Sequence, residues 1–180
     1  MLDILILGVL RHGPVHGYEL KQRVQRPTLR TLSNNSLYPL LRRFETAGAV
    51  TKQVQTTEGR PPRHMYAITA AGRALFHELI TTLGPEEASE DEAFLVRVGF
   101  FAEMTLTERA GVLLARDAAL ADQQARAQEL LDAWPGARGW RPLATRHLLD
   151  RLAHDRAFVA DLLERSEAEA GAELGSDAPR

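Results

Sequence analysis

The sequence contains no cysteine. Structural disulfide bonds and thiolate metal centres are therefore excluded, and a reducing compartment such as the cytoplasm is permitted. Long hydrophobic runs are also missing. The apolar start, residues 2–10, is short, carries Asp3 and follows no basic region, so we interpret it as a core helix rather than a signal peptide or membrane span. We expect a cytoplasmic protein with no membrane partner.

Motifs of the common enzyme classes are missing too. The sequence has no nucleophile elbow, dinucleotide-binding glycine pattern or phosphate-binding loop. His77 and Glu78 resemble the start of a zinc-protease helix, but Thr81 stands where the second histidine is needed. Because no nucleophile, base and orienting group are brought together, we predict a protein that is not an enzyme and has no cofactor or metal.

Positive charge is concentrated in the first half of the chain. Residues 1–83 contain 11 Lys and Arg against 5 Asp and Glu, whereas residues 84–180 contain 11 against 19. A basic first half suits a polyanionic partner, and an acidic second half does not. Charge alone leaves open the simpler interpretation that both surfaces are merely solvated.

The stretch from Ser33 to Gly48 has the pattern of a short amphipathic helix. Ser33 can cap its start, apolar residues recur at helical spacing, and Gly48 provides an end. Pro39 is expected in the first turn, where its missing N–H costs nothing. The expected core residues are Leu37, Leu40, Leu41 and Phe44, and the expected polar face is formed by Asn35, Ser36, Tyr38, Arg42 and Arg43.

Two more helices are expected before this one, over residues 2–11 and from Gly17 to just before Pro27. Two helices joined by a connection, with the second presenting hydroxyl, amide and guanidinium groups, form a helix-turn-helix arrangement. After Gly48 the apolar period changes from helical to alternating, which predicts a β-hairpin. Its tip over residues 56–63 contains glycine, two prolines, Arg60 and Arg63, so we expect a projecting basic loop, or wing.

The second half of the chain is expected to be helical. The fold class is therefore mainly α with a small β-hairpin, an N-terminal winged helix-turn-helix followed by a C-terminal helical dimerisation region. We expect four segments: a DNA-binding domain over 1–84, a linker over 85–92, a helical dimerisation and ligand-binding domain over 93–168, and a disordered tail over 169–180. Apolar residues seven apart predict a helix-pair seam, and for a homodimer interface we select Leu113, Leu120, Leu152, Val159 and Leu163.

Three motifs occur together in order. They are His16-Gly17-Tyr18-Glu19-Leu20, then Ser36-Leu37-Tyr38-Pro39-Leu40-Leu41-Arg42-Arg43-Phe44-Glu45 with Gly48, and Gly59-Arg60-Pro61 followed by Tyr66-Ala67-Ile68-Thr69-Ala70-Ala71-Gly72. This set resembles the phenolic-acid-decarboxylase regulator family, PadR, over residues 1 to about 83. The resemblance implies a winged-helix transcriptional regulator, usually a dimeric repressor, whose C-terminal helices dimerise and help to shape a ligand pocket.

The sequence therefore predicts a dimeric, ligand-responsive repressor that binds a pseudo-palindromic operator in double-stranded DNA. The expected DNA contacts are Tyr18, Lys21, Asn34, Asn35, Ser36, Tyr38, Arg42, Arg43, Arg60 and Arg63. A small apolar or aromatic effector is expected in a pocket lined by Phe100, Trp134 and Trp140.

Two other functions remain open. The first is a winged-helix module that binds protein rather than DNA, through the acidic second half. The second is a ligand carrier or enzyme, favoured only by His147, Asp150 and His154, which share one helical stripe. A lone stripe of this kind is more often a solvated surface than a metal site.

Overall fold

The computed structural model describes residues 1–26, 33–55, 63–134 and 139–176. The chain divides into two compact units, which we call unit 1 (Met1–Ile80) and unit 2 (Thr81–Arg180). Among the described residues, no helix is long and apolar enough to cross a bilayer. The mainly helical fold with a small antiparallel sheet confirms the predicted fold class.

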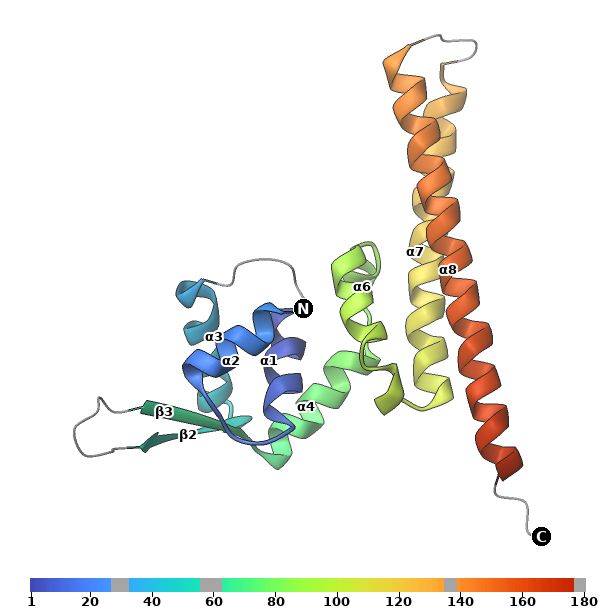
Figure 1. The fold of residues 1–180 in the computed structure, drawn as a ribbon. Coiled ribbons are helices and arrows are strands. Elements are labelled where there is room, and N and C mark those ends of the chain that lie inside the picture. The colour runs from blue at the N-terminus through green and yellow to red at the C-terminus, as the bar shows by residue number, and fades with distance from the viewer. Residues whose placement is uncertain (27–32, 56–62, 135–138, 177–180) are drawn as a thin grey trace. The chain divides into compact units, whose positions relative to one another are not determined.

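Unit 1 is formed by short helices around a small sheet (Figure 1). The helix α1 is apolar on almost every side, and Ile4, Ile6 and Leu7 are each at most 1% exposed, so it is the expected core helix. The elements in chain order are α1 (Leu2–Leu10), β1 (Val15–His16), α2 (Gly17–Gln25), α3 (Asn34–Thr46), β2 (Val50–Gln55), β3 (Arg63–Ile68) and α4 (Ala70–Thr81).

The sheet contains the predicted hairpin and one further strand. Its order is β1-β3-β2, with every pair antiparallel, and Val15 pairs with Tyr66 while Val50 pairs with Ile68. The strand β1 has two residues, too few to show the alternation on which sequence-based strand prediction depends. In Figure 1, β2 and β3 extend away from the helices of unit 1.

A tight corner joins the hairpin to α4. The Thr69 hydroxyl donates to the carbonyl oxygen of Gly48 at 2.7 Å and accepts from the backbone N–H of Gly72 at 3.0 Å. Gly48 has a φ of +72°, which favours glycine. A β-carbon placed on Gly72 would lie 2.1 Å from the carbonyl oxygen of Ala49, so only glycine fits there.

All the regular elements that the structure describes in unit 2 are helices. The segment expected to be a linker, residues 85–92, contains α5 and the start of α6, and Ala88 in it is only 1% exposed. Proline at the first helical position and two acidic residues after it favour a helix start there. The elements are α5 (Pro85–Ala88), α6 (Asp91–Val98), the 3-10 helix η1 (Phe101–Glu103), α7 (Leu106–Asp132) and α8 (Trp140–Ser176).

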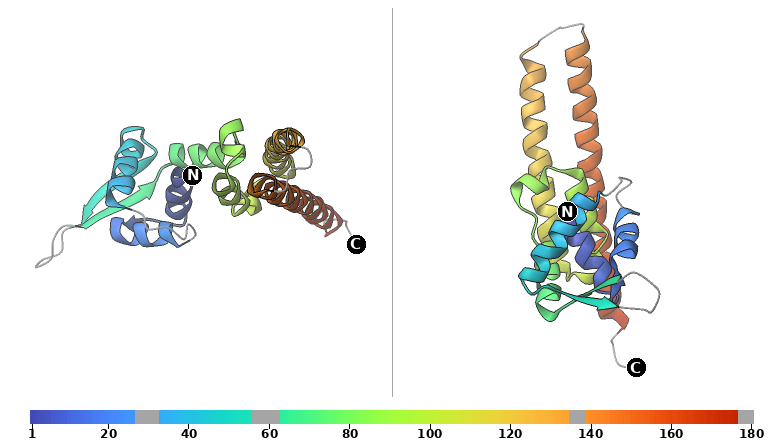
Figure 2. Two further views of the ribbon diagram at one scale, coloured as in Figure 1. Left: turned by 90° about the horizontal axis from the view of Figure 1, so that it is seen from above. Right: turned by 90° about the vertical axis from the view of Figure 1, so that its left-hand side faces the viewer.

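The helices α7 and α8 form a long antiparallel hairpin and lie side by side in Figures 1 and 2. The expected seam is present within one chain, since Leu113, Leu120 and Leu152 are each 1% exposed. A regular helix pair would have a second row of apolar residues along the seam. Asp117 and Gln124 occupy two positions of that row, and both accept hydrogen bonds from Arg156 of α8.

The start of α7 and the end of α8 differ in how well the sequence predicts them. A capping box formed by Thr105 and Glu108 begins α7. At the other end of the chain, α8 continues to Ser176, so residues 169–176, expected to be a disordered tail, are helical. Glu169 in this stretch accepts a hydrogen bond from Arg109 at 2.7 Å, a long-range contact that no local pattern reveals.

Candidate nucleic-acid interface

The helix α3 presents one buried and one exposed face. Leu37, Leu41 and Phe44 are at most 3% exposed and form the inner face, as predicted. Leu40, also expected in the core, is only half-buried. Ser33 caps the helix, because its Oγ accepts the backbone N–H of Ser36 at 3.1 Å.

Pro39 lies deeper in α3 than expected. The helix begins at Asn34, so Pro39 falls in the second turn rather than the first. Proline has no N–H to donate to the carbonyl oxygen of Asn35, four residues earlier. The backbone of Asn35 therefore lacks its usual helical donor, on the exposed side of the helix.

The two adjacent arginines of α3 have different surroundings. The Arg43 guanidinium binds the carboxylate of Asp3 on α1 at 2.8 Å and lies 5.5 Å from the centre of the Phe44 ring. Arg42 is exposed and has no ion pair within the described part of the chain. Of the two, Arg42 is thus the one whose charge is available to a partner.

Arg42 lies on the same side of α3 as Tyr38, and both influence Tyr66 of β3. Burial raises the pKa of Tyr66 above its ordinary value, Tyr38 and Glu45 raise it further, and Arg42 opposes them. Tyr38, Arg42 and Glu45 are spaced at i, i+4 and i+7, which places them on one stripe of the helix. That stripe therefore lies near Tyr66 of β3.

A groove of about 450 Å³ opens between the start of α2, α3 and β3. A β-carbon on Gly17 would lie 3.3 Å from the Tyr66 ring and 3.5 Å from the Tyr38 hydroxyl, so the absence of a side chain there lets the two tyrosines approach α2. Tyr18 is 73% exposed at the rim. The lining residues are His16, Gly17, Tyr18, Glu19, Tyr38, Arg63, His64 and Tyr66.

The comparisons agree with this arrangement. Residues 6–78 match the model of the transcriptional regulator PadR-like family. Through this region, the chain belongs to the PadR-like family. The match spans α1 to most of α4 and so includes all the elements that form the groove and the exposed face of α3.

Solved structures similar to this PadR-like protein include three regulators. A transcriptional regulator from Clostridium thermocellum is 26% identical over 42% of this chain and 75% of its own, with a TM-score of 0.39. A PadR-like transcription factor from Bacteroides fragilis is 25% identical over 44% and 76%, with a TM-score of 0.41. Bacillus subtilis PadR in complex with operator DNA is 18% identical over 91% and 98%, with a TM-score of 0.44. No curated protein matches the sequence closely enough to be counted.

The structure brings together only part of the predicted DNA-contact set. Tyr18, Tyr38 and Arg63 line the groove, and Arg42 lies beside it. Asn35 and Ser36 are exposed at the start of α3, and Lys21 is half-buried on α2. Arg60 and the side chain of Asn34 lie outside the described residues.

Two histidines of the groove were not predicted from the sequence. The Nδ1 atom of His16 is buried and has no hydrogen-bond partner in the described residues. His64 is exposed on β3, where it pairs with Val54 of β2. In the sequence, His16 precedes Gly17 and His64 follows Arg63. These neighbours alone do not predict whether the two histidines line a groove or lie on an ordinary surface.

The three residues expected to line a ligand pocket, Phe100, Trp134 and Trp140, do not lie together. Phe100 precedes α7, whereas Trp134 and Trp140 lie at its other end, and a helix of 27 residues is about 40 Å long. Trp140 is 86% exposed. These three side chains therefore cannot line a common pocket within a single chain.

The residues chosen for a dimer interface are divided between two environments. Leu120 and Leu152 are enclosed between α7 and α8 of one chain. Leu113, Val159 and Leu163 line a second groove of about 410 Å³ on the hairpin, together with Leu114, Asp117, Arg156, Ala157 and Ala160.

The candidate metal stripe is not a metal site in this arrangement. His147, Asp150 and His154 are all exposed on α8. Among the described residues, no group of three or more histidine, cysteine, aspartate or glutamate side chains is arranged to hold a metal ion.

Proposed function

We propose that this PadR-like protein regulates transcription from the cytoplasm by binding double-stranded DNA as a repressor, rather than by catalysing a reaction. The observation that carries the proposal is the exposed guanidinium of Arg42, which has no ion pair among the described residues and lies beside Tyr38 on α3. Guanidinium and hydroxyl groups on a helix are suited to base edges and phosphates in a major groove.

The groove of unit 1 extends this surface to Arg63 at the start of β3. With α3 in a major groove, Arg63 and the hydroxyls of Tyr18 and Tyr38, which line the groove of unit 1, would contact the adjacent sugar-phosphate backbone. These contacts fix the orientation of the protein, whereas contacts from α3 distinguish the bases. The acidic residues of unit 2 lie outside this surface in the sequence and would repel the same backbone.

The direct test is binding of the purified protein to the DNA upstream of its own gene. Fluorescence anisotropy should show binding that weakens steeply between about 50 and 200 mM salt, because each neutralised phosphate adds about 0.9 to the slope of log K against log salt. A scrambled duplex of equal length provides the control. Absence of binding even at low salt would contradict the proposal.

A second candidate function is favoured by the charge of unit 2. A winged-helix module that binds a basic protein would use the acidic second half and leave Arg42 unoccupied. The same titration separates the two functions, since this module would show no salt-sensitive binding to DNA.

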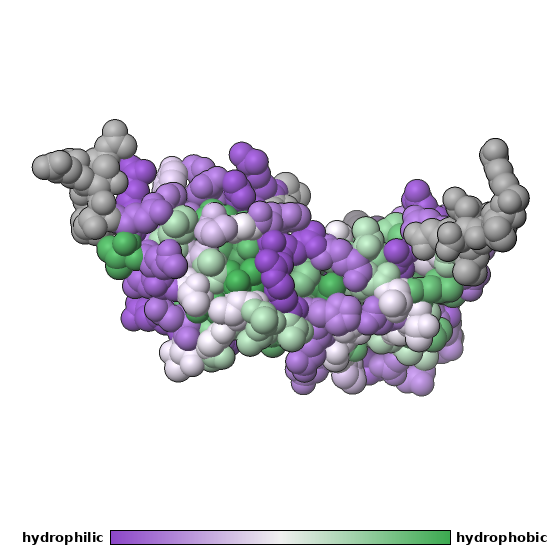
Figure 3. Space-filling model, turned by 90° about the horizontal axis from the view of Figure 1, so that it is seen from below, coloured by the Kyte–Doolittle hydropathy of each residue, from purple (hydrophilic) through white to green (hydrophobic). Residues whose placement is uncertain are grey.

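We further propose that the protein acts as a homodimer through the hairpin groove of unit 2. Leu114 is 63% exposed at this groove, whose lining also includes Leu113, Val159 and Leu163. Figure 3 shows that hydrophobic side chains remain visible among hydrophilic ones on the molecular face drawn there. A helix from a second copy would cover the groove, and two copies of α3 would then contact successive major grooves of a pseudo-palindromic operator.

Replacing Leu114 by Glu should convert the dimer into a monomer, because the introduced carboxylate would be buried at the contact without a partner. Light scattering coupled to size-exclusion chromatography measures the change in mass. Leu130→Glu is the matched control, since Leu130 is 53% exposed on the same helix but does not line the groove. If both variants remain dimeric, the dimer interface lies elsewhere.

Regulation by a small apolar or aromatic effector remains part of the proposal. Such a molecule, bound among the helices of unit 2, would act by changing the spacing between the two copies of α3. Release of the protein from its upstream DNA in a small-molecule screen would identify it.

A further inference from the structure

Two arginines of unit 2 are almost completely buried. Arg97 of α6 is 1% exposed and Arg116 of α7 is 2% exposed. Arginine is rarely buried to this extent unless its charge is paired, because removal of a guanidinium from water is costly. The partners of these two side chains therefore determine whether this part of the fold is stable.

Arg97 binds three residues of the segment from Thr82 to Ala93. Its Nε donates to the carbonyl oxygen of Thr82 at 2.9 Å and its Nη1 to that of Ala93 at 2.8 Å. Its Nη2 binds the carboxylate of Glu87 at 2.6 Å. One side chain thus joins the residues before α5, α5 itself and α6.

Arg116 fastens the same segment to α7. Its Nη1 donates to the carbonyl oxygen of Ala88, the last residue of α5, at 2.7 Å. Its Nη2 binds the carboxylate of Asp91, the first residue of α6, and its guanidinium lies 5.3 Å from the centre of the Phe94 ring. A one-turn helix such as α5 is not stable by itself, so its position depends on these tertiary contacts.

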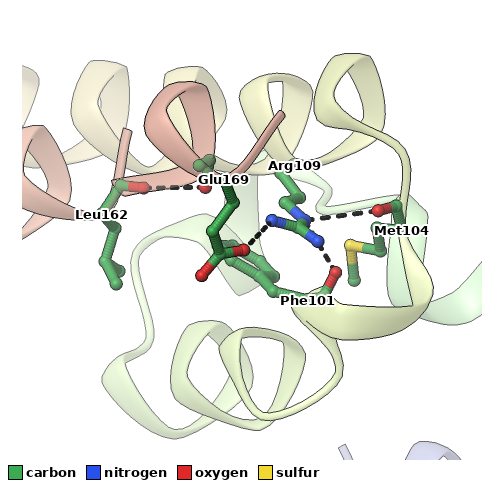
Figure 4. Close-up of polar contacts among 6 residues, drawn as sticks. Phe101, Met104, Arg109, Leu162 and Glu169 are labelled. Carbon is green, nitrogen blue, oxygen red and sulfur yellow. Dashed lines mark hydrogen bonds and ion pairs between the residues drawn. The ribbon is translucent and has the colours of Figure 1, made fainter. Parts of the chain in front are cut away.

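Arg116 belongs to a row of donors on α7. Arg109, Arg116 and Gln123 are seven residues apart and therefore share one side of the helix. Gln123 donates to the carbonyl oxygen of Ser89 at 3.4 Å. Figure 4 shows Arg109 between the carbonyl oxygens of Phe101 and Met104 and the carboxylate of Glu169. This side of α7 therefore holds main-chain carbonyls from both ends of the segment 88–104.

The two buried ion pairs are asymmetric. The guanidinium groups are enclosed, whereas the side chains of their partners, Glu87 and Asp91, are 42% and 55% exposed. Solvent, ions or a binding partner can reach the carboxylates but not the cations. Loss of a carboxylate charge would remove an anionic partner from a buried cation, which favours opening of the surrounding structure.

We propose that the ion pairs Glu87–Arg97 and Asp91–Arg116 form an arginine latch, a conformational device that fixes residues 82–97 to the hairpin and opens when its carboxylates are neutralised. The latched segment begins two residues after unit 1 ends, so it is the first part of unit 2 and connects unit 1 to the hairpin along the sequence. When the latch is closed, this connection moves with α7. When it is open, the connection loosens while the seam between α7 and α8 remains.

The test uses hydrogen exchange of the full chain carrying Glu87→Gln and Asp91→Asn, which remove the two charges at nearly constant shape. We expect amides of residues 85–98 to exchange at least about tenfold faster, with α7, α8 and unit 1 unchanged. Glu86→Gln and Glu90→Gln are the matched controls in the same acidic stretch. Unchanged exchange over 85–98, an equal effect in the controls, or faster exchange throughout the chain would each overturn the latch.

A double-mutant cycle separates the ion pair from general destabilisation. In a background of Arg116→Met, which keeps an unbranched side chain but removes the charge, Asp91→Asn should have no further effect on exchange. An additive effect would contradict pairing between these residues.

A last measurement connects the latch to the proposed function, on which it rests. The Glu87→Gln, Asp91→Asn variant should bind a two-half-site operator at least about threefold more weakly while its affinity for a single half-site is unchanged, because the two copies of α3 are less well fixed. If the variant and the unmodified protein bind the operator with equal affinity, the latch has no role in regulation. If the unmodified protein binds no DNA, the proposed function fails, and the exchange experiment still decides whether the latch exists.

Discussion

Replacement of Gly72 by Ala should lower the free energy of unfolding of unit 1 by about 3 kcal/mol, near the upper end of what overpacking costs. The added β-carbon would lie 2.1 Å from the carbonyl oxygen of Ala49 and 2.7 Å from Cγ1 of Ile68. The first of these atoms is backbone and is held by its own hydrogen bonds from Thr69, so it cannot move without disturbing the corner between the hairpin and α4.

Urea unfolding followed by circular dichroism measures this loss. The fluorescence of Trp134 and Trp140, both in unit 2, serves as an internal reference that should not change. Gly111→Ala is the matched control, because a β-carbon there meets nothing within 4 Å in the interior of α7. That variant should be stabilised by about 0.5–1 kcal/mol through helix propensity. A Gly72→Ala protein as stable as the unmodified one would contradict the packing at this corner.

Local sequence patterns were sufficient to predict much of unit 1. The capping serine, the apolar spacing of α3 and the alternation of β2 and β3 each depend on neighbouring residues, and the structure confirms those elements. The motif from Thr69 to Gly72 occurs in the family resemblance, but its physical reason lies in Gly48 and Ala49, about twenty residues earlier. Sequence spacing cannot reveal such a contact.

Other features depend on distant partners. An acidic stretch after a Gly-Pro pair is typical of a linker, but Glu87 and Asp91 compensate buried arginines that lie 10 and 25 residues away in the sequence. Apolar residues seven apart predict a helix seam without specifying whether the second helix belongs to the same chain. The row from Leu113 to Leu120 packs on α8 of its own chain, and the groove beside Leu114 is the surface where we propose that a second copy binds.

The two arginines of α3 illustrate the same limit within the candidate site. Neighbouring residues on a helix point about 100° apart, so the sequence predicts that one of Arg42 and Arg43 is better placed for DNA but not which. The contact between Arg43 and Asp3, forty residues earlier, distinguishes them. Arg43 is held by α1, and Arg42 lies beside Tyr38 and the groove.

We therefore expect Arg42→Ala to weaken operator binding about 10- to 100-fold, the cost of one lost charged contact. If Arg42 binds a phosphate in each half of a dimer, the salt slope should also fall by about 2, since each phosphate contact contributes about 0.9. Arg43→Ala should change the affinity less than about threefold, because its charge is already paired with Asp3.

Anisotropy titrations of both variants at several salt concentrations decide between these outcomes, with circular dichroism to verify that α3 is retained. The pair is well matched, since the substitutions have the same chemistry at adjacent positions of one helix. A base contact by Arg42 would lower the affinity for the operator but not for a scrambled duplex, whereas a phosphate contact would lower both equally. Equal losses in Arg42→Ala and Arg43→Ala would mean that the ion pair with Asp3 opens on DNA, and the assignment of separate roles to the two arginines would then be wrong.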